Sequence, residues 1–152
     1  MSQIYFIFSF GLLSTFALSF FLAMVRQLKI CDVNLVQTVG SFLTRSSHTF
    51  SSFVGWFFHL IFGVFFAFLY IFVMKAIPEV ATYNLSYLFA GIALGFVHGI
   101  IFSFLLLVLV TEHHPVKKYR ELGFKAAIFY FLGHVLYGLG IGFFYMFMVS
   151  FS

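Results

Sequence analysis

Hydrophobic positions along this chain fall into four long runs, separated by three segments that hold most of the polar side chains. The runs cover residues 4–25, 53–74, 85–111 and 126–149, and none of them contains Asp, Glu, Lys or Arg. A helix needs about 20 apolar residues to cross the hydrocarbon core of a bilayer. Because no water is available there to pair with the backbone, a spanning segment of this kind is expected to be helical. The sequence therefore predicts an all-α integral membrane protein, with residues 1–152 forming one transmembrane four-helix bundle.

The composition supports a lipid environment and excludes a soluble domain. Hydrophobic residues make up 63% of the chain and charged residues 8%, whereas a soluble domain has about 25% charged residues. The formal net charge of +4 lies in the connections between the runs. We interpret this basic excess as a topology signal, so the predicted partner is the lipid bilayer and not a nucleic acid. The single cysteine, Cys31, rules out an intramolecular disulfide.

Positive charges also predict the orientation of the chain. The first connection (residues 26–52) and the third (residues 112–125) contain every Lys and Arg except Lys75. Because basic connections stay on the cytoplasmic side, we expect both of these segments there, and both termini and residues 77–86 on the outer side. Pro78 and Pro115 mark the expected ends of the second and third helices.

Within the first connection, residues 33–44 have apolar side chains at helical spacing. This pattern predicts an amphipathic helix on the inner leaflet, with Asp32 as its N-cap. A disordered loop is the alternative.

An internal repeat is visible between the two halves of the chain. His59, Gly63, Ala67 and Tyr70 align without gaps with His134, Gly138, Gly142 and Tyr145, and Gly11, Thr15 and Ser19 align with Gly95, Gly99 and Ser103. We interpret the repeat as two helical hairpins in tandem, related by an axis along the membrane normal; chance similarity between apolar helices is the alternative. The glycines recur every four residues, a spacing that lets helix backbones approach closely. We therefore expect the glycine faces in the bundle interior.

Three histidines lie within the predicted spans: His59, His98 and His134. Because polar side chains at this depth are costly and usually functional, one hypothesis is a cofactor site. In it, His59 and His134 bind haem b from two sides, with Gly63 and Gly138 leaving room for the macrocycle. A transition metal bound by His59, His98 and His134 is a second form of the same hypothesis. The alternatives are a proton or substrate path, and structural hydrogen bonds to Tyr70, Ser103, Tyr137 or Tyr145.

Glu112, His113 and His114 form a second candidate metal cluster at the end of the third run. His98 precedes Glu112 by fourteen residues, which corresponds to about 21 Å along a helix, so the two sets cannot share one ion. A solvated helix end is the alternative interpretation of this cluster.

Several of these motifs resemble a group of small four-helix bacterial membrane proteins of unknown function. The resemblance is carried by Gly55-Trp56 to Gly63, Gly95 to Gly99, Gly133-His134 to Gly138, and the segment from Asp32 to Ser41. It covers most of the chain and implies a four-helix protein of the bacterial inner membrane with histidines at the same positions. In that membrane, the outer-side termini predicted from charge would be periplasmic. The resemblance implies no activity. This chain departs from the group in its 27 phenylalanines and in the Glu112-His113-His114 sequence.

Two functional hypotheses follow from the sequence. In the first, an intramembrane histidine cluster binds haem or a transition metal, for example in electron transfer. In the second, the protein is an accessory or scaffold subunit of a larger membrane complex, or a homo-oligomer, and its histidines are structural. No catalytic residue is predicted, and the sequence does not decide whether the protein is an enzyme.

Overall fold

The computed structural model describes residues 3–77 and 84–150 and contains helices but no strands in those ranges. The helices are α1 (Gln3–Gln27), α2 (Leu35–Thr44), α3 (Thr49–Ala76), α5 (Asn84–His113), α6 (Lys117–Arg120) and α7 (Phe124–Ser150). Four of these, α1, α3, α5 and α7, are long and apolar enough to cross a membrane, which confirms the predicted all-α membrane bundle. Pro78 and most of the second connection lie outside the described residues.

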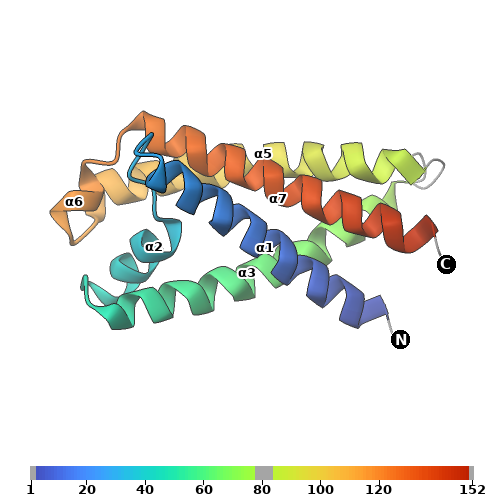
Figure 1. Cartoon of the computed structure of the whole chain (residues 1–152), viewed down its shortest axis with the longest axis horizontal. Helices are drawn as coiled ribbons and strands as arrows, with labels where there is room; N and C mark the ends of the chain where they lie inside the picture. The colour runs from blue at the N-terminus through green and yellow to red at the C-terminus, as the bar shows by residue number, and fades with distance from the viewer. Residues whose placement is uncertain (1–2, 78–83, 151–152) are drawn as a thin grey trace.

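The four long helices do not pack with equal closeness. α5 and α7 form the most extensive pair, and α1 packs against both α3 and α7. α3 has few contacts with α5 and α7, and in Figure 1 it diverges from them toward the end of the bundle where α2 lies. Both chain termini lie at the opposite end (Figure 1). The first and third connections therefore share one end of the bundle, which we call the connection end.

Glycines explain the close pairing of α5 and α7. A Cβ atom at Gly95 would lie 2.7 Å from the carbonyl oxygen of His134, and one at Gly138 would overlap the carbonyl of Gly91. Contacts this short leave no room for a side chain, so the two backbones meet directly. The prediction that the glycine faces lie in the interior is confirmed for this pair.

The first hairpin repeats this arrangement between α1 and α3. A Cβ atom at Gly11 would lie 2.9 Å from Cα of Val64, and one at Gly63 would overlap the Thr15 hydroxyl. Gly11 and Gly63 correspond in the repeat to Gly95 and Gly138, so the two hairpins cross at matching positions. Between the hairpins the symmetry is lost, because α1 packs on α7 whereas α3 stands away from α5.

Helix α2 occupies the space that α3 leaves, and its start differs from the prediction. Asn34, not Asp32, is the N-cap, and its Oδ1 accepts a hydrogen bond of 3.0 Å from the Gln37 backbone. Asp32 instead pairs with Lys118, whose Nζ lies 2.8 Å from its carboxylate. Gly40 of α2 packs directly on α3, since a Cβ atom at Gly40 would overlap the Ser51 carbonyl. An amphipathic helix is therefore present, but it packs into the bundle.

The Gly138 contact provides a direct test of this packing. We expect Gly138→Ala to force α5 and α7 apart and to destabilise the protein by about 1–3 kcal/mol, the usual effect of overpacking. Gly123→Ala is the matched control, because a Cβ atom there meets nothing within 4 Å. Thermal unfolding in mild detergent measures both variants. Equal melting temperatures for the two would contradict the proposed role of the glycine contact.

Candidate functional site

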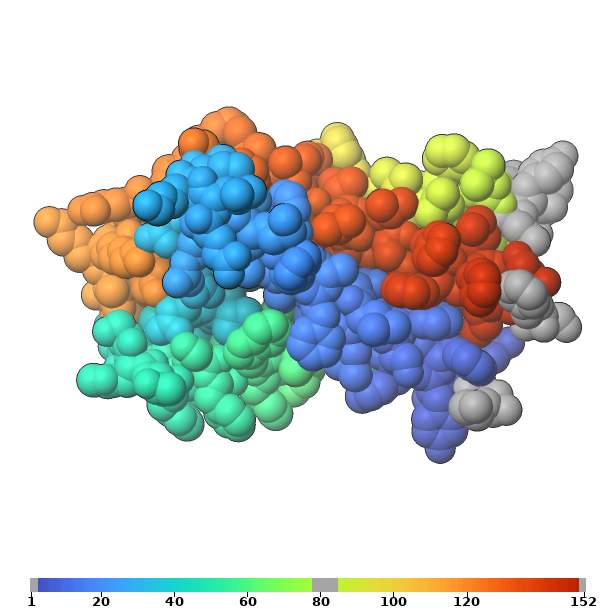
Figure 2. Space-filling view, in the orientation of Figure 1, coloured from blue at the N-terminus to red at the C-terminus, as the bar shows by residue number. Residues whose placement is uncertain are grey.

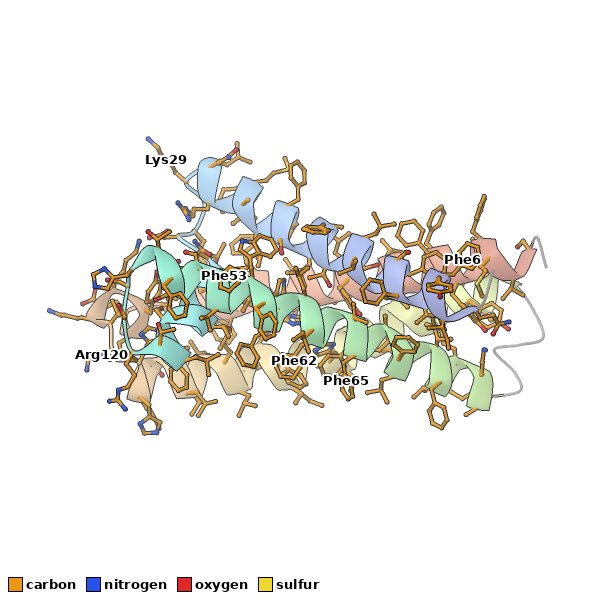
Figure 3. The ribbon with its side chains drawn as sticks, turned by 90° about the horizontal axis from the view of Figure 1, so that it is seen from below. Phe6, Lys29, Phe53, Phe62, Phe65 and Arg120 are labelled. Atoms are coloured by element: carbon orange, nitrogen blue, oxygen red, sulfur yellow. The ribbon has the colours of Figure 1, made fainter. Side chains whose placement is uncertain are left out.

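All three intramembrane histidines line one cavity of about 210 Å³ in the middle of the bundle. Its walls come from α1, α2, α3, α5 and α7 and are mainly apolar. Phe62 of α3 and Phe102 of α5 belong to the lining and are 52% and 39% exposed. Figure 3 shows Phe62 on the side of α3 that faces α5. The cavity, which we call the histidine cavity, therefore reaches the lipid-facing surface between these two helices.

Glycine packing brings His98 and His134 together. His98 lies between Gly95 and Gly99 on α5, and both glycines rest on α7, where a Cβ atom at Gly99 would lie 3.3 Å from Cβ of His134. The two imidazole rings consequently have a centroid separation of only 4.6 Å. The ring of Phe66 covers His98 from α3 at 4.1 Å.

The hydrogen bond to Nδ1 assigns the tautomer of His134, and the tautomer of His98 depends on Tyr70. Nδ1 of His134 lies 2.7 Å from the Tyr130 carbonyl oxygen, which can only accept, so in the neutral ring Nδ1 carries the proton and Nε2 has a lone pair. Nδ1 of His98 lies 2.9 Å from the Tyr70 hydroxyl, which has no other hydrogen bond within the described residues. If Tyr70 donates this bond, Nε2 of His98 carries a proton.

Neither Nε2 atom has a hydrogen-bond partner within the described ranges, and neither is closed off from the surface. The His134 Nε2 atom therefore offers an acceptor to whatever enters the histidine cavity, and the His98 Nε2 atom offers a donor when Tyr70 donates to Nδ1 of His98.

His59 lines the same cavity from the other side but is bonded separately. Its Nε2 atom lies 3.0 Å from the Ser19 hydroxyl of α1. Across residues 3–77 and 84–150, no three His, Cys, Asp or Glu side chains are arranged to hold a metal ion. The cavity thus brings His59, His98 and His134 to its walls without assembling them as a three-ligand set. The closest histidine pair is His98–His134, and not the His59–His134 pair expected for haem.

The glycines assigned to a cofactor have a different role. Gly63 borders the histidine cavity, but the position of its missing side chain is taken by Thr15. The corresponding space at Gly138 is taken by the backbone of Gly91 and Gly95. Helix packing therefore fills the room that these residues were expected to leave for a macrocycle.

The cluster at the end of α5 does not converge on one point. Glu112 and His113 form an exposed pair, with 3.7 Å between Oε2 and Nε2. His114 is 1% exposed and turns inward, where its Nε2 lies 3.1 Å from the Thr38 carbonyl of α2 and its Nδ1 accepts a 3.0 Å hydrogen bond from the Val116 backbone. His114 therefore links α2 to the third connection, and the described residues do not bring Glu112, His113 and His114 together as a three-ligand set.

The expected hydrogen-bond partners were partly identified from the sequence. Tyr70 does pair with His98. Tyr137 instead donates to the Gly63 carbonyl, and the Ser103 hydroxyl is buried without a partner among the described residues. The partners that sequence analysis missed are Ser19 and the Tyr130 carbonyl. Ser19 had a signal in the repeat, where it aligns with Ser103, whereas a backbone carbonyl leaves no trace in a sequence.

Comparisons with known proteins add no relative to this description. No protein-family model matches the chain, and no similar protein was found among curated proteins or among solved structures. The resemblance to small four-helix bacterial membrane proteins therefore stays a prediction, and the function must be argued from the histidine cavity itself.

Proposed function

We propose that the protein binds, within the bilayer, a small lipid-soluble molecule that carries a carbonyl or hydroxyl group. The observation behind this proposal is that the Nε2 atoms of His98 and His134 lie beside an apolar cavity and have no hydrogen-bond partner among residues 3–77 and 84–150. A mainly apolar site with a few polar groups is the usual design for recognising such ligands. With Tyr70 donating to Nδ1 of His98, the Nε2 donor of His98 suits a carbonyl oxygen, and the Nε2 acceptor of His134 suits a hydroxyl.

The size and opening of the histidine cavity define what it accepts. Its volume of about 210 Å³ is below the ~300–1,000 Å³ typical of pockets that enclose a whole ligand. The opening beside Phe62 and Phe102 leads to the lipid side. The polar ring of a ligand would therefore sit inside, with its apolar tail between α3 and α5 in the lipid. This volume, with the packed glycines, favours such a ligand over haem.

A transition metal on His98 and His134 is the second candidate function, and one observation favours it. Metal-ligating histidines usually donate their other ring N–H to a carbonyl or carboxylate, as His134 does to Tyr130. The ring separation of 4.6 Å allows both imidazoles to approach one ion. The remaining ligands would then come from water or from a bound molecule.

The accessory-subunit hypothesis has less support from the packing. It relied partly on glycine faces for contact with other subunits. The glycines of α5 and α7 that the structure describes are instead used inside the bundle. Those of α5 pack on α7, Gly138 and Gly142 of α7 pack on α5, and Gly133 and Gly140 of α7 pack on α1.

For the membrane arrangement, we propose a cytoplasmic connection end and outer-side termini, as in a bacterial inner-membrane protein. The support is charge, because every Lys and Arg except Lys75 belongs to the connections at that end.

The ligand proposal is tested with a short-chain naphthoquinone, whose carbonyls mimic the expected polar group. Trp56 is the only tryptophan, and its ring lies 6.0 Å from that of His59, so quinone binding in the cavity should quench its fluorescence. We expect His98→Leu to weaken binding about tenfold, the effect of losing roughly 1.4 kcal/mol. His113→Leu is the matched control, since His113 is exposed outside the cavity. Equal quenching curves for both variants would refute the proposed binding mode.

The metal candidate is tested by elemental analysis of the purified protein, counted per chain. If the metal hypothesis is correct, zinc, copper or iron is present near one per chain and falls in His98→Gln and His134→Gln. His59→Gln should retain the metal because His59 is bonded to Ser19. Metal at background level in folded, monodisperse wild-type protein would remove this candidate.

The orientation is tested with a membrane-impermeant maleimide on Cys31, the only cysteine. We expect labelling from the cytoplasmic side only. Partial burial raises the pKa of the Cys31 thiol, so the reactive thiolate is scarcer at neutral pH and labelling should accelerate as the pH rises. A Cys31→Ser, Gln3→Cys double variant is the control and should be labelled only from outside. The reverse pattern would overturn the orientation.

A further inference from the structure

A second cavity lies at the connection end of the bundle, between α1 and α3, with the start of α2 as its floor. Its volume is about 320 Å³, and Figure 2 shows the hollow between α1 and α3 on this face. Leu22, Val33 and Leu35 make its base apolar. Arg26, Asn34 and Trp56 contribute polar groups to its lining, which also includes Ser19, Gln27 and Ser52.

The charge of this interfacial cavity is positive. No Asp or Glu lines it, and the nearby Asp32 is already held by Lys118, with 2.8 Å between Nζ and the carboxylate. Arg26 lies farther from Asp32, with 3.9 Å from Nε. The terminal nitrogens of Arg26 have no hydrogen-bond partner within the described part of the chain. A guanidinium with unpaired terminal nitrogens is suited to bind a phosphate through two parallel hydrogen bonds.

Neutral donors complete the lining. The side-chain oxygen of Asn34 is used by the Gln37 backbone, which leaves the Asn34 amide group to donate. The indole N–H of Trp56 has no acceptor among the residues described, and Trp56 is 36% exposed. Neutral donors arranged around one cation favour an anion that has several acceptor oxygens. A phosphodiester is such an anion, because its phosphate carries two charged oxygens and two ester oxygens.

The depth of the cavity identifies the source of such an anion. Arg26 directly follows the first apolar run, and Trp56 has the amphipathic ring that is enriched at membrane–water interfaces. Both therefore belong at the level of the lipid headgroups. Basic pockets between transmembrane helices at this level commonly bind anionic headgroups.

We propose that the interfacial cavity binds the phosphate group of an anionic membrane phospholipid. Arg26 holds the phosphate, Asn34 and Trp56 donate to its ester oxygens, and the apolar base receives the start of the acyl chains. This proposal is independent of the ligand in the histidine cavity.

The test compares thermal unfolding in mild detergent after addition of dioleoyl phosphatidylglycerol, dioleoyl phosphatidylcholine or inorganic phosphate. We expect phosphatidylglycerol to raise the melting temperature of the wild type, since a ligand that binds only the folded state stabilises it. The other two additions should produce little change. Arg26→Gln should abolish the shift. Arg120→Gln is the matched control, because Arg120 lies at the same end on α6 (Figure 3), outside the cavity lining.

A second variant keeps the test decisive if Arg26→Gln does not fold. Ala23 is exposed at the rim of the interfacial cavity, so Ala23→Phe should fill it without altering any charge or helix cap. Loss of the shift in Ala23→Phe supports the site. The same shift in all variants, or equal shifts with both lipids, would overturn the proposal. A full shift with inorganic phosphate alone would show that free phosphate is the ligand and would refute lipid binding.

Discussion

Direct contact between the backbones of α5 and α7 is the interaction on which the rest of the structure depends. In lipid, helices gain little from burying apolar side chains against one another, so close packing at small residues supplies the association energy. Here Gly91, Gly95 and Gly138 allow the contact. The same contact has a chemical consequence, because it places the ring of His98 on α5 4.6 Å from that of His134 on α7. A packing motif and a candidate binding site are therefore built from the same turns of helix.

The position of helix α2 accounts for the two cavities in the bundle. The first connection includes the ten-residue helix α2, whereas the third includes only the four-residue α6. α2 packs between α3 and the rest of the bundle. α3 consequently stands away from α5, and Leu35 of α2 lines both the histidine cavity and the interfacial cavity. His114 of the third connection holds α2 in place by a hydrogen bond from its Nε2 to the Thr38 carbonyl. The longer first connection in this way makes the packing of the two hairpins asymmetric.

The spans and the inward glycine faces could be predicted from the sequence because both depend on local composition and periodicity. The start of α2 was predicted less well, because Asp32 and Asn34 are both good N-caps and a distant residue, Lys118, decides between them. The histidine partners depended on helix rotation and crossing angle. Those quantities bring His98 next to His134 and His59 next to Ser19, and no spacing along the chain encodes them.

Unpaired polar atoms inside the membrane differ in what they imply. The hydroxyls of Ser14 and Ser103 are buried without partners among the described residues, but a hydroxyl rotates and can reach the carbonyl four residues before it, as Thr15 does with Gly11. An imidazole nitrogen has no such freedom. With Nδ1 of His134 bonded to Tyr130, its Nε2 has a fixed direction and needs a partner that comes from outside its own helix. Because an unsatisfied polar group in hydrocarbon costs several kcal/mol, a ring fixed in this way favours occupation of the histidine cavity by a molecule able to complete the bond.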